Sequence, residues 1–219
     1  MSQKKAFLFD LNGTMIDDMH YHIKAWHRIL NELGANISLE KMKEECYGKN
    51  DELLERMFPG SFTEAEKQQM SLEKEKQYQL QYKPHLALLP GLHQFLKEAK
   101  TLEVKMAIGS AAIMFNIDFV LDNLDLRSCF NAIVSADEVK ISKPDPETYI
   151  SCTYLFGVAA ADCIVFEDSP KGVESALRAG MKAVVITTLH EPHEFKQFSN
   201  VLMCIQDYTQ IKVADVVTG

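Results

Sequence analysis

The sequence predicts an α/β protein with a Rossmann-like parallel sheet flanked by helices and an inserted helical domain. Short apolar runs alternate with helical segments over most of the chain, which is typical of a doubly wound sheet. A stretch of about 70 residues after the first run shows helical periodicity only. With 219 residues, the chain is long enough for one core and a small second domain.

The expected strands are continuously apolar rather than alternating, as strands buried on both faces of a parallel sheet are. They cover residues 4–10, 104–110, 131–137, 162–168, 183–188 and 201–205. Helices are expected between them at 91–101, 111–123, 145–156 and 170–179, the last closed by Gly180. This order predicts that the carboxyl ends of the strands share one edge of the sheet.

The segment after the first strand has an apolar face at helical spacing. Its members are Met19, Ile23, Trp26, Leu30 and Leu33. We therefore divide the chain into an α/β core domain of residues 1–15 and 88–219 and a helical domain of residues 16–87.

The composition excludes some classes of partner. A net charge of −8 argues against nucleic acid or an anionic membrane, and no apolar stretch approaches the ~20 residues that span a bilayer. The five cysteines are scattered and lack CxxC spacing, which is typical of reduced thiols in a cytoplasmic protein. We expect a cytoplasmic monomer with neither a nucleic-acid nor a membrane partner.

Polar side chains stand at the expected strand ends, where open α/β sheets bind ligands. They are Asp10, Ser110, Lys143, Glu167 and Asp168. One acid at a strand end means little, but three carboxylates, a hydroxyl and a lysine at converging ends indicate a functional site.

Four segments around these residues resemble the ordered motifs of the haloacid dehalogenase-like phosphotransferase superfamily. They are FDLNGT (9–14), IGS (108–110), SKPDPE (142–147) and VFEDSPKGVESA (165–176). The helical insert lies where one branch of that family carries its cap. This branch contains β-phosphoglucomutase and many small phosphatases, so the resemblance implies a catalytic core and a cap but leaves the substrate open.

The resemblance implies phosphoryl transfer with Asp10 as the nucleophile, through an aspartyl-phosphate. It also implies a Mg²⁺ ion, because an all-oxygen site suits a hard cation. The ligands would be Asp10, the main-chain carbonyl of Asn12 and Asp168. Glu167 would be a further ligand or would orient a metal-bound water.

The same motifs imply ligands for the phosphate. Ser110 and the backbone N–H of Ala111, expected at a helix start, would donate to it. Lys143, which the following proline biases to an extended backbone, would offset the carboxylates and hold the phosphoryl group. Thr14 and the turn at Gly13 would shape the loop around the anion.

Asn12 departs from the family pattern. Most phosphatases and mutases of this superfamily carry a second aspartate there, which protonates the leaving oxygen and then activates the attacking group. An amide can hydrogen-bond but cannot transfer a proton. Three explanations stay open: an engineered substitution, a naturally slow enzyme with a good leaving group, or a protein that has lost catalysis and only binds phosphate.

The first expected helix of the insert matches the family's YHxxAW pattern with His22 and Trp26. His22 is a candidate substrate contact, and the alternative is a partly buried histidine that packs beside Trp26. The loop YGKND (47–51) corresponds to the family's specificity loop, which makes Gly48, Lys49 and Asn50 candidate substrate contacts.

In β-phosphoglucomutase an arginine of that loop holds the second phosphate, and Asp51 stands at the matching position. A carboxylate would repel that phosphate, although Lys49 or Lys74 would compensate in part. We therefore expect a Mg²⁺-dependent phosphatase of a small phosphorylated metabolite. The alternatives are a hexose-phosphate mutase and a catalytically silent phosphate-binding protein.

Overall fold

The structure, a computed structural model, describes residues 6–217 and divides the chain into two compact units. The α/β unit takes in the chain up to Asp17 and from Ala87 onward, and the helical unit is Asp18–Leu86. These boundaries lie close to the division at residues 16 and 87. The assignment of the units as catalytic core and cap stays a prediction.

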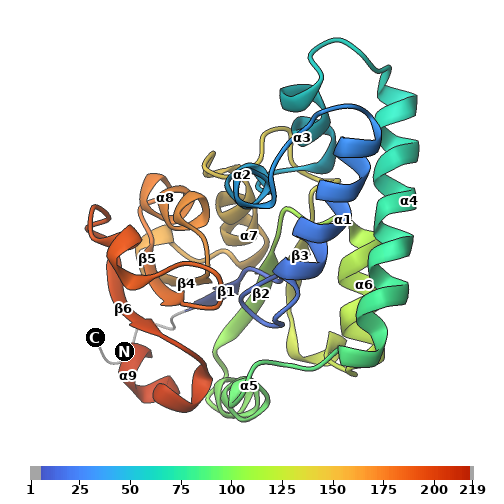
Figure 1. Cartoon of the computed structure of the whole chain (residues 1–219). Helices are drawn as coiled ribbons and strands as arrows, with labels where there is room; N and C mark the ends of the chain where they lie inside the picture. Colours follow the sequence, from blue (N-terminus) through green and yellow to red (C-terminus); the bar gives the residue numbers. More distant parts are fainter. Residues whose placement is uncertain (1–5, 218–219) are drawn as a thin grey trace. The chain divides into compact units, whose positions relative to one another are not determined.

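The α/β unit contains a parallel sheet with the strand order β3-β2-β1-β4-β5-β6 (Figure 1). The strands are β1 (Ala6–Phe9), β2 (Lys105–Gly109), β3 (Ala132–Val134), β4 (Cys163–Glu167), β5 (Lys182–Ile186) and β6 (Val201–Ile205). The predicted fold class and all of the expected strands are confirmed; β6 has the expected bounds, and the other strands are shorter than expected. Residues 4 and 5 of the first one lie outside the described residues.

Helices cover both faces of this sheet. They are α5 (Leu92–Thr101), α6 (Met114–Asn123), α7 (Glu147–Phe156), α8 (Pro170–Arg178) and α9 (Val213–Val217), with short 3-10 turns η2 (Arg127–Cys129), η3 (Ala160–Asp162), η4 (Pro192–Phe195) and η5 (Tyr208–Gln210). On one face α7 packs on β2 and β3, and α8 packs on β4 and β5. On the other face α5 contacts β2, α9 and η5.

The alternation of side chains along β1 explains this layering. Ala6 and Leu8 belong to the core cluster shared with α7 and α8. Phe7 and Phe9 point to the opposite face, where the ring of Phe7 stacks on Phe95 of α5 at 5.6 Å between centroids. Because both faces are buried, a continuously apolar strand is what the position requires.

The helix expected from residue 111 begins three residues later. Ile113 is extended and precedes the first helical residue of α6, Met114. The N–H of Met114 donates to Asp137 Oδ2 at 2.8 Å, so a distant carboxylate caps this helix. The expectation that Ala111 stands at a helix start is therefore wrong.

The helical unit consists of α1 (Met19–Glu32), α2 (Leu39–Glu45), α3 (Asn50–Met57), α4 (Glu64–Tyr82) and the turn η1 (Lys83–His85). Its buried side chains include Ile23, Trp26 and Leu30 of α1, Leu53 and Leu54 of α3, and Tyr78 and Tyr82 of α4. Leu33, expected on the apolar face, is 39% exposed because α1 ends at Glu32.

Two remaining expectations concern membranes and thiols. Within residues 6–217, every helix is too short or too polar to cross a bilayer. The five cysteines are free thiols, with Cys152 and Cys163 buried and the others half-buried.

Candidate active site

Asp10 follows the last residue of β1 at the carboxyl edge of the sheet. Its N–H donates to the carbonyl of Phe166 at 3.0 Å, which continues the pairing of β1 with β4 by one residue. The Asp10 residue is only 8% exposed. The central strand therefore delivers a carboxylate to a buried position and fixes its backbone.

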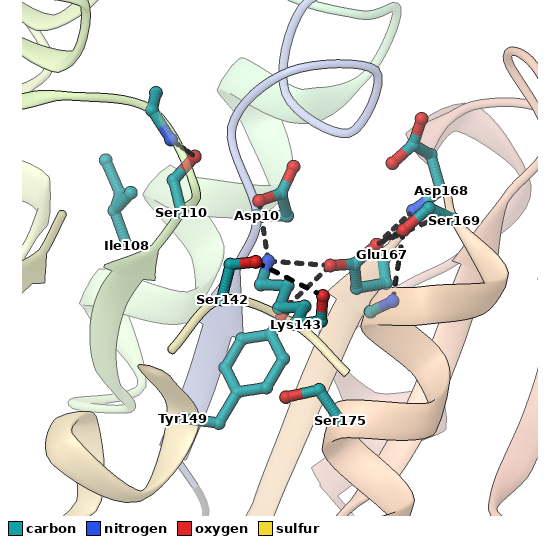
Figure 2. A network of polar contacts seen from close by, with 12 residues as sticks. Asp10, Ile108, Ser110, Ser142, Lys143, Tyr149, Glu167, Asp168, Ser169 and Ser175 are labelled. Atoms are coloured by element: carbon teal, nitrogen blue, oxygen red, sulfur yellow. Dashed lines mark hydrogen bonds and ion pairs between the residues drawn. The ribbon is translucent and has the colours of Figure 1, made fainter. Parts of the chain in front are cut away.

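Lys143 reaches Asp10 from the loop before α7. Its ammonium donates to Asp10 Oδ1 and to Glu167 Oε1, both at 2.7 Å (Figure 2). The ring of Tyr149 lies beneath the ammonium, with 4.6 Å from Nζ to the ring centroid. The Lys143–Pro144 peptide bond is cis. Lys143 thus joins the ends of β1 and β4, and it lies 133 positions from Asp10 in the sequence.

Glu167, the last residue of β4, has both carboxylate oxygens engaged by protein donors. Oε1 accepts from Tyr149 Oη at 2.8 Å as well as from Lys143. Oε2 accepts from the N–H groups of Asp168 and Ser169 and from Ser169 Oγ, each at 3.0 Å. A Cβ at Gly172 would lie 1.8 Å from Oε1, so the first turn of α8 approaches the carboxylate as closely as only glycine allows.

Asp168 completes a group of three buried acids. One carboxylate oxygen each of Asp10, Glu167 and Asp168 lies within 4.8 Å of the others. Burial raises the pKa of Asp168 well above its usual range, and the neighbouring carboxylates of Glu167 and Asp10 add to this rise. Lys143 forms ion pairs with two of the three acids, so three carboxylates gather around one ammonium, an arrangement that a cation would stabilise.

The pKa values of Lys143 and Glu167 both shift in the direction that favours the charged form. Burial opposes the charged form of Lys143, but the adjacent Asp10 and Glu167 outweigh it and raise the lysine pKa. For Glu167, the Lys143 ammonium and the donated hydrogen bonds overcome burial and lower the pKa. Both groups are therefore charged at neutral pH. An all-oxygen donor set of this kind fits a hard divalent cation.

The structure brings Ser110 to the same edge of the sheet (Figure 2), at the end of β2, where it is buried. Its N–H donates to Val134 O at 3.0 Å, and its Oγ accepts from the N–H of Ala112 at 3.2 Å. Ala111, next to it, is half-buried. Their loop is thus held in place by β3 and by the serine itself.

The loop after β1 contains Asn12, Gly13 and Thr14. Gly13 has a φ of 72°, which explains the glycine, and Asn12 is half-buried and bridged to Ile16. Thr14 is fully buried, and its Oγ1 has no hydrogen-bond partner within residues 6–217. A buried hydroxyl in this condition is uncommon in proteins.

The sequence interpretation missed three tyrosine and threonine hydroxyls near this site: Tyr149, which donates to Glu167, and Thr188 and Tyr208, which donate to the carbonyls of Gly13 and Thr14. Tyr149 follows the SKPDPE motif on an apolar helix, so its position was visible although its partner was not. Thr188 ended an expected strand.

The candidate substrate residues of the helical unit take part in a separate buried network. Lys74 of α4, 2% exposed, donates to His22 Nδ1 at 2.6 Å and to Glu75 Oε1 at 2.9 Å. His22 Nε2 lies 3.3 Å from Asp18 Oδ2, and Tyr78 Oη donates to the same carboxylate oxygen. His22 is thus buried inside this unit with polar partners, and its role as a substrate contact stays a prediction.

Trp26 is buried beside this network, with Lys74 Nζ 5.4 Å from the centroid of its ring. Asn50, the first residue of α3, joins the network from the 47–51 loop. Its Nδ2 donates to Ser71 Oγ and to Glu75 Oε1, each at 2.7 Å. The loop is therefore tied to α4 by a side chain that the sequence had marked as a substrate contact.

The two residues before Asn50 shape the same loop. Gly48 has a φ of 77°, which fits the turn there, and the N–H of Lys49 donates to Glu52 Oε2 at 3.0 Å. Lys49 and Asp51 are half-buried. The structure thus places Gly48, Lys49 and Asn50 in one stretch that leads into α3.

Comparisons with known proteins agree with this geometry. The family model for haloacid dehalogenase-like hydrolases matches residues 7–186. A β-phosphoglucomutase of Bacillus subtilis is 32% identical over 188 residues, with 82% of each chain covered. A fructose-1-phosphate phosphatase of Escherichia coli is 28% identical over 186 residues, which cover 84% of this chain and 97% of that protein.

A solved structure has the same fold over almost the whole chain. A hydrolase of the haloacid dehalogenase family IA from Entamoeba histolytica gives a TM-score of 0.86 at 25% identity, covering 98% of this chain and 100% of that one. The strand order, the helical insert and the acidic edge of the sheet agree with these matches. The chain therefore belongs to the haloacid dehalogenase-like hydrolase family, in its β-phosphoglucomutase-like branch with a helical cap.

Proposed function

We propose that this protein is a Mg²⁺-dependent phosphatase of small phosphorylated metabolites, sugar phosphates above all, which acts through an aspartyl-phosphate on Asp10. One observation carries the proposal: Asp10 is buried at the sheet edge, with Oδ1 held by Lys143 and two more carboxylates within 4.8 Å. The relative that acts on fructose 1-phosphate supports the substrate class.

The chemistry needs two displacements at phosphorus. A carboxylate oxygen of Asp10 forms a bond to phosphorus while the ester P–O bond breaks, and the leaving oxygen takes up a proton from water, because Asn12 cannot supply one. Water then attacks the same phosphorus, releases inorganic phosphate and restores Asp10. The ammonium of Lys143 beside Asp10 reduces the repulsion between the carboxylate and an incoming phosphate dianion.

The acidic group fits a magnesium ion. Three carboxylates meet with one lysine, and burial, together with the charges of Glu167 and Asp10, raises the pKa of Asp168. Asp10, Asp168 and the main-chain carbonyl of Asn12 would hold the ion, which would neutralise charge on the phosphoryl oxygens when bound. We give Glu167 the orienting role, because its oxygens already accept from Lys143, Tyr149 and the start of α8.

The remaining polar groups at this edge would bind the phosphate. We propose Ser110, the N–H of Ala111, Lys143 and Thr14 as its donors. The buried Thr14 hydroxyl, without a partner in the described part of the chain, supports this role.

We propose that the helical unit serves as the cap and selects the substrate through the 47–51 loop. The candidates are His22, Trp26, Gly48, Lys49, Asn50 and Lys74. The hydrogen bonds of Asn50 and Lys74 inside the unit support a role in shaping the loop. We also propose that the protein acts as a monomer in the cytoplasm.

The test compares the native chain with Asn12→Asp in a screen of phosphorylated metabolites with magnesium. Asn12 cannot protonate the leaving oxygen, so the aspartate should raise phosphate release by about 10²–10⁴-fold. Equal, fast rates in both forms would refute a proton-transfer role at this position. If Asn12→Asp hydrolyses no phosphate ester, a phosphate-binding protein becomes the better reading.

The mutase alternative has support from the 32% identical β-phosphoglucomutase. It predicts that Asn12→Asp converts one hexose phosphate into its isomer when an activating sugar bisphosphate is added. Asp51 argues against it, because a carboxylate in the loop repels a second phosphate. Asp51→Arg should therefore raise isomer formation relative to phosphate release if the loop selects the substrate.

A further inference from the structure

Two hydroxyls from the last part of the chain hold the loop that follows Asp10. Thr188 Oγ1 donates to the carbonyl of Gly13 at 2.6 Å, across 175 positions of sequence. Tyr208 Oη donates to the carbonyl of Thr14 at 3.2 Å, across 194 positions. The family model matches residues 7–186, so both donors lie outside the part of the chain that it covers.

Tyr208 is held in place by contacts other than its hydrogen bond to the loop. The side chain is buried, and its ring packs against Phe9, Phe95 and Phe166 at 5.5–6.4 Å between centroids. Its N–H donates to Pro90 O at 3.0 Å. At the next residue, Gly91, a Cβ would lie 2.6 Å from the backbone of Tyr208, so η5 docks closely on the start of α5.

Thr188 stands two residues beyond β5, next to a threonine with a different partner. The hydroxyl and the N–H of Thr187 both donate to Ile205 O of β6, at 3.2 Å from Oγ1 and 2.8 Å from N. Thr188 turns instead to Gly13. Thr187 therefore makes a hydrogen bond that stabilises the sheet, whereas the adjacent Thr188 makes one that holds the loop.

We propose that Thr188 and Tyr208 are positioning residues that fix the backbone of residues 10–14, an inference that rests on the proposed function. Gly13 is in the left-handed region, where the backbone has wide freedom, and a loop with such a residue needs external contacts to stay in one conformation. The two hydroxyls engage consecutive carbonyls of this loop. Because an error of about 1 Å at a reacting group costs about 10²-fold in rate, these bonds act on catalysis through Asp10 and Asn12.

The experiment places Thr188→Val and Tyr208→Phe in the Asn12→Asp protein and measures hydrolysis of para-nitrophenyl phosphate. Both changes remove a hydroxyl and keep the shape of the side chain. Each should lower kcat by roughly tenfold, the rate equivalent of one lost hydrogen bond. Thr188→Ser, which keeps the hydroxyl, should restore kcat.

Thr187→Val is the matched control, because it removes a hydroxyl bond to β6 at the adjacent position. The second readout is amide hydrogen exchange of residues 11–16 in the folded protein. Exchange there should become faster in Thr188→Val and Tyr208→Phe, and should stay unchanged in Thr187→Val. A mere loss of global stability would instead raise exchange across the sheet in all three variants.

The outcomes separate this inference from the proposed function. If kcat and loop exchange in Thr188→Val and Tyr208→Phe match those of Thr187→Val, the positioning role is overturned. If the Asn12→Asp protein hydrolyses nothing, the phosphatase proposal fails, while exchange at residues 11–16 still supports or overturns the anchoring of the loop.

Discussion

Among the buried lysines of this protein, one in each unit lies within a polar network, and the acids around these two lysines differ in their pKa values. Lys143 at the sheet edge is 6% exposed and bonds to Asp10 and Glu167. Lys74 in the helical unit is 2% exposed and bonds to Glu75 and His22. Each buried ammonium is paired with a buried carboxylate, which is the condition under which a protein tolerates a buried charge.

In the network around Lys74, neighbouring protein groups stabilise the charged form of Glu75. Burial alone would raise the pKa of Glu75, but the charges of Lys74 and His22 and the hydrogen bond from Asn50 lower it to about 2. At the sheet edge the pKa of the third acid, Asp168, is instead raised. The sheet-edge cluster thus gathers three carboxylates around Lys143, and burial together with the neighbouring acids keeps the pKa of Asp168 high.

The difference indicates what each cluster does. A network whose buried polar groups hydrogen-bond one another is able to fix the fold of a helical unit without a ligand. A cluster with excess negative charge next to a nucleophile is typical of a site that is completed by a cation. The comparison between Lys74 and Lys143 thus supports the proposal that the first network is structural and the second catalytic, and variants of either lysine test it.

The largest expected effect is at the sheet edge. Asp10→Asn in the Asn12→Asp protein removes the nucleophile, and we expect hydrolysis to fall by about 10⁴-fold or more. The fluorescence of Trp26, the one tryptophan of the chain, should stay unchanged because it lies in the helical unit. Retained hydrolysis would remove Asp10 as the nucleophile.

Replacing each lysine by methionine tests the comparison directly. Lys74→Met leaves buried carboxylates without their partner, and we expect the free energy of unfolding of the helical unit to fall by about 3–5 kcal/mol. Lys76→Met changes an exposed lysine of the same helix and should cost less than about 0.5 kcal/mol. Urea denaturation followed by Trp26 fluorescence measures both.

Magnesium should distinguish the two lysines. Lys143→Met leaves three acids that a bound cation is able to offset, so added Mg²⁺ should restore part of the lost stability. The Lys74→Met protein should gain no more from Mg²⁺ than the native chain. Equal rescue of both variants would contradict the assignment of only one cluster as the cation site.

Acid should weaken the helical unit through Glu75. The pKa is about 2 in the folded unit against an ordinary 4.5, so the stabilisation is complete above about pH 4.5 and is lost as the pH falls toward 2. The loss amounts to about 3 kcal/mol at most. Glu75→Gln should flatten this part of the stability–pH curve, and the exposed Glu73→Gln should not. Equal curves for both would contradict the role of Glu75.

Sequence patterns predicted the residues that stand at strand ends. Asp10, Glu167 and Asp168 end apolar strands, and in a parallel sheet such ends share one edge, so their convergence followed from the order of the elements. Lys143 came from a recognised motif. These predictions depend on local patterns, which a single sequence displays.

The residues that were missed act through long-range contacts. The partners of Thr188 and Tyr208 lie 175 and 194 positions away, and no local pattern marks a hydroxyl that bonds a distant carbonyl. The helix start at Ala111 was misplaced for the same reason, because the cap of α6 comes from Asp137, 23 positions away.

The smallest expected effect concerns the hydrogen bond from Tyr149 to Glu167 in the sheet-edge cluster. Tyr149→Phe keeps the ring under the ammonium of Lys143 and removes only the hydroxyl that donates to Glu167 Oε1 at 2.8 Å. A hydrogen bond to a charged group contributes about 1.5–3 kcal/mol. Because Lys143, Asp168 and Ser169 still bond Glu167, we expect the lower end of this range, a loss of about tenfold in kcat/KM for para-nitrophenyl phosphate. Tyr154→Phe on the same helix, 82% exposed, is the control and should change nothing. If Tyr149→Phe also leaves kcat/KM unchanged, the backbone N–H groups at the start of α8 suffice to hold Glu167, and the tyrosine only fills space beneath Lys143.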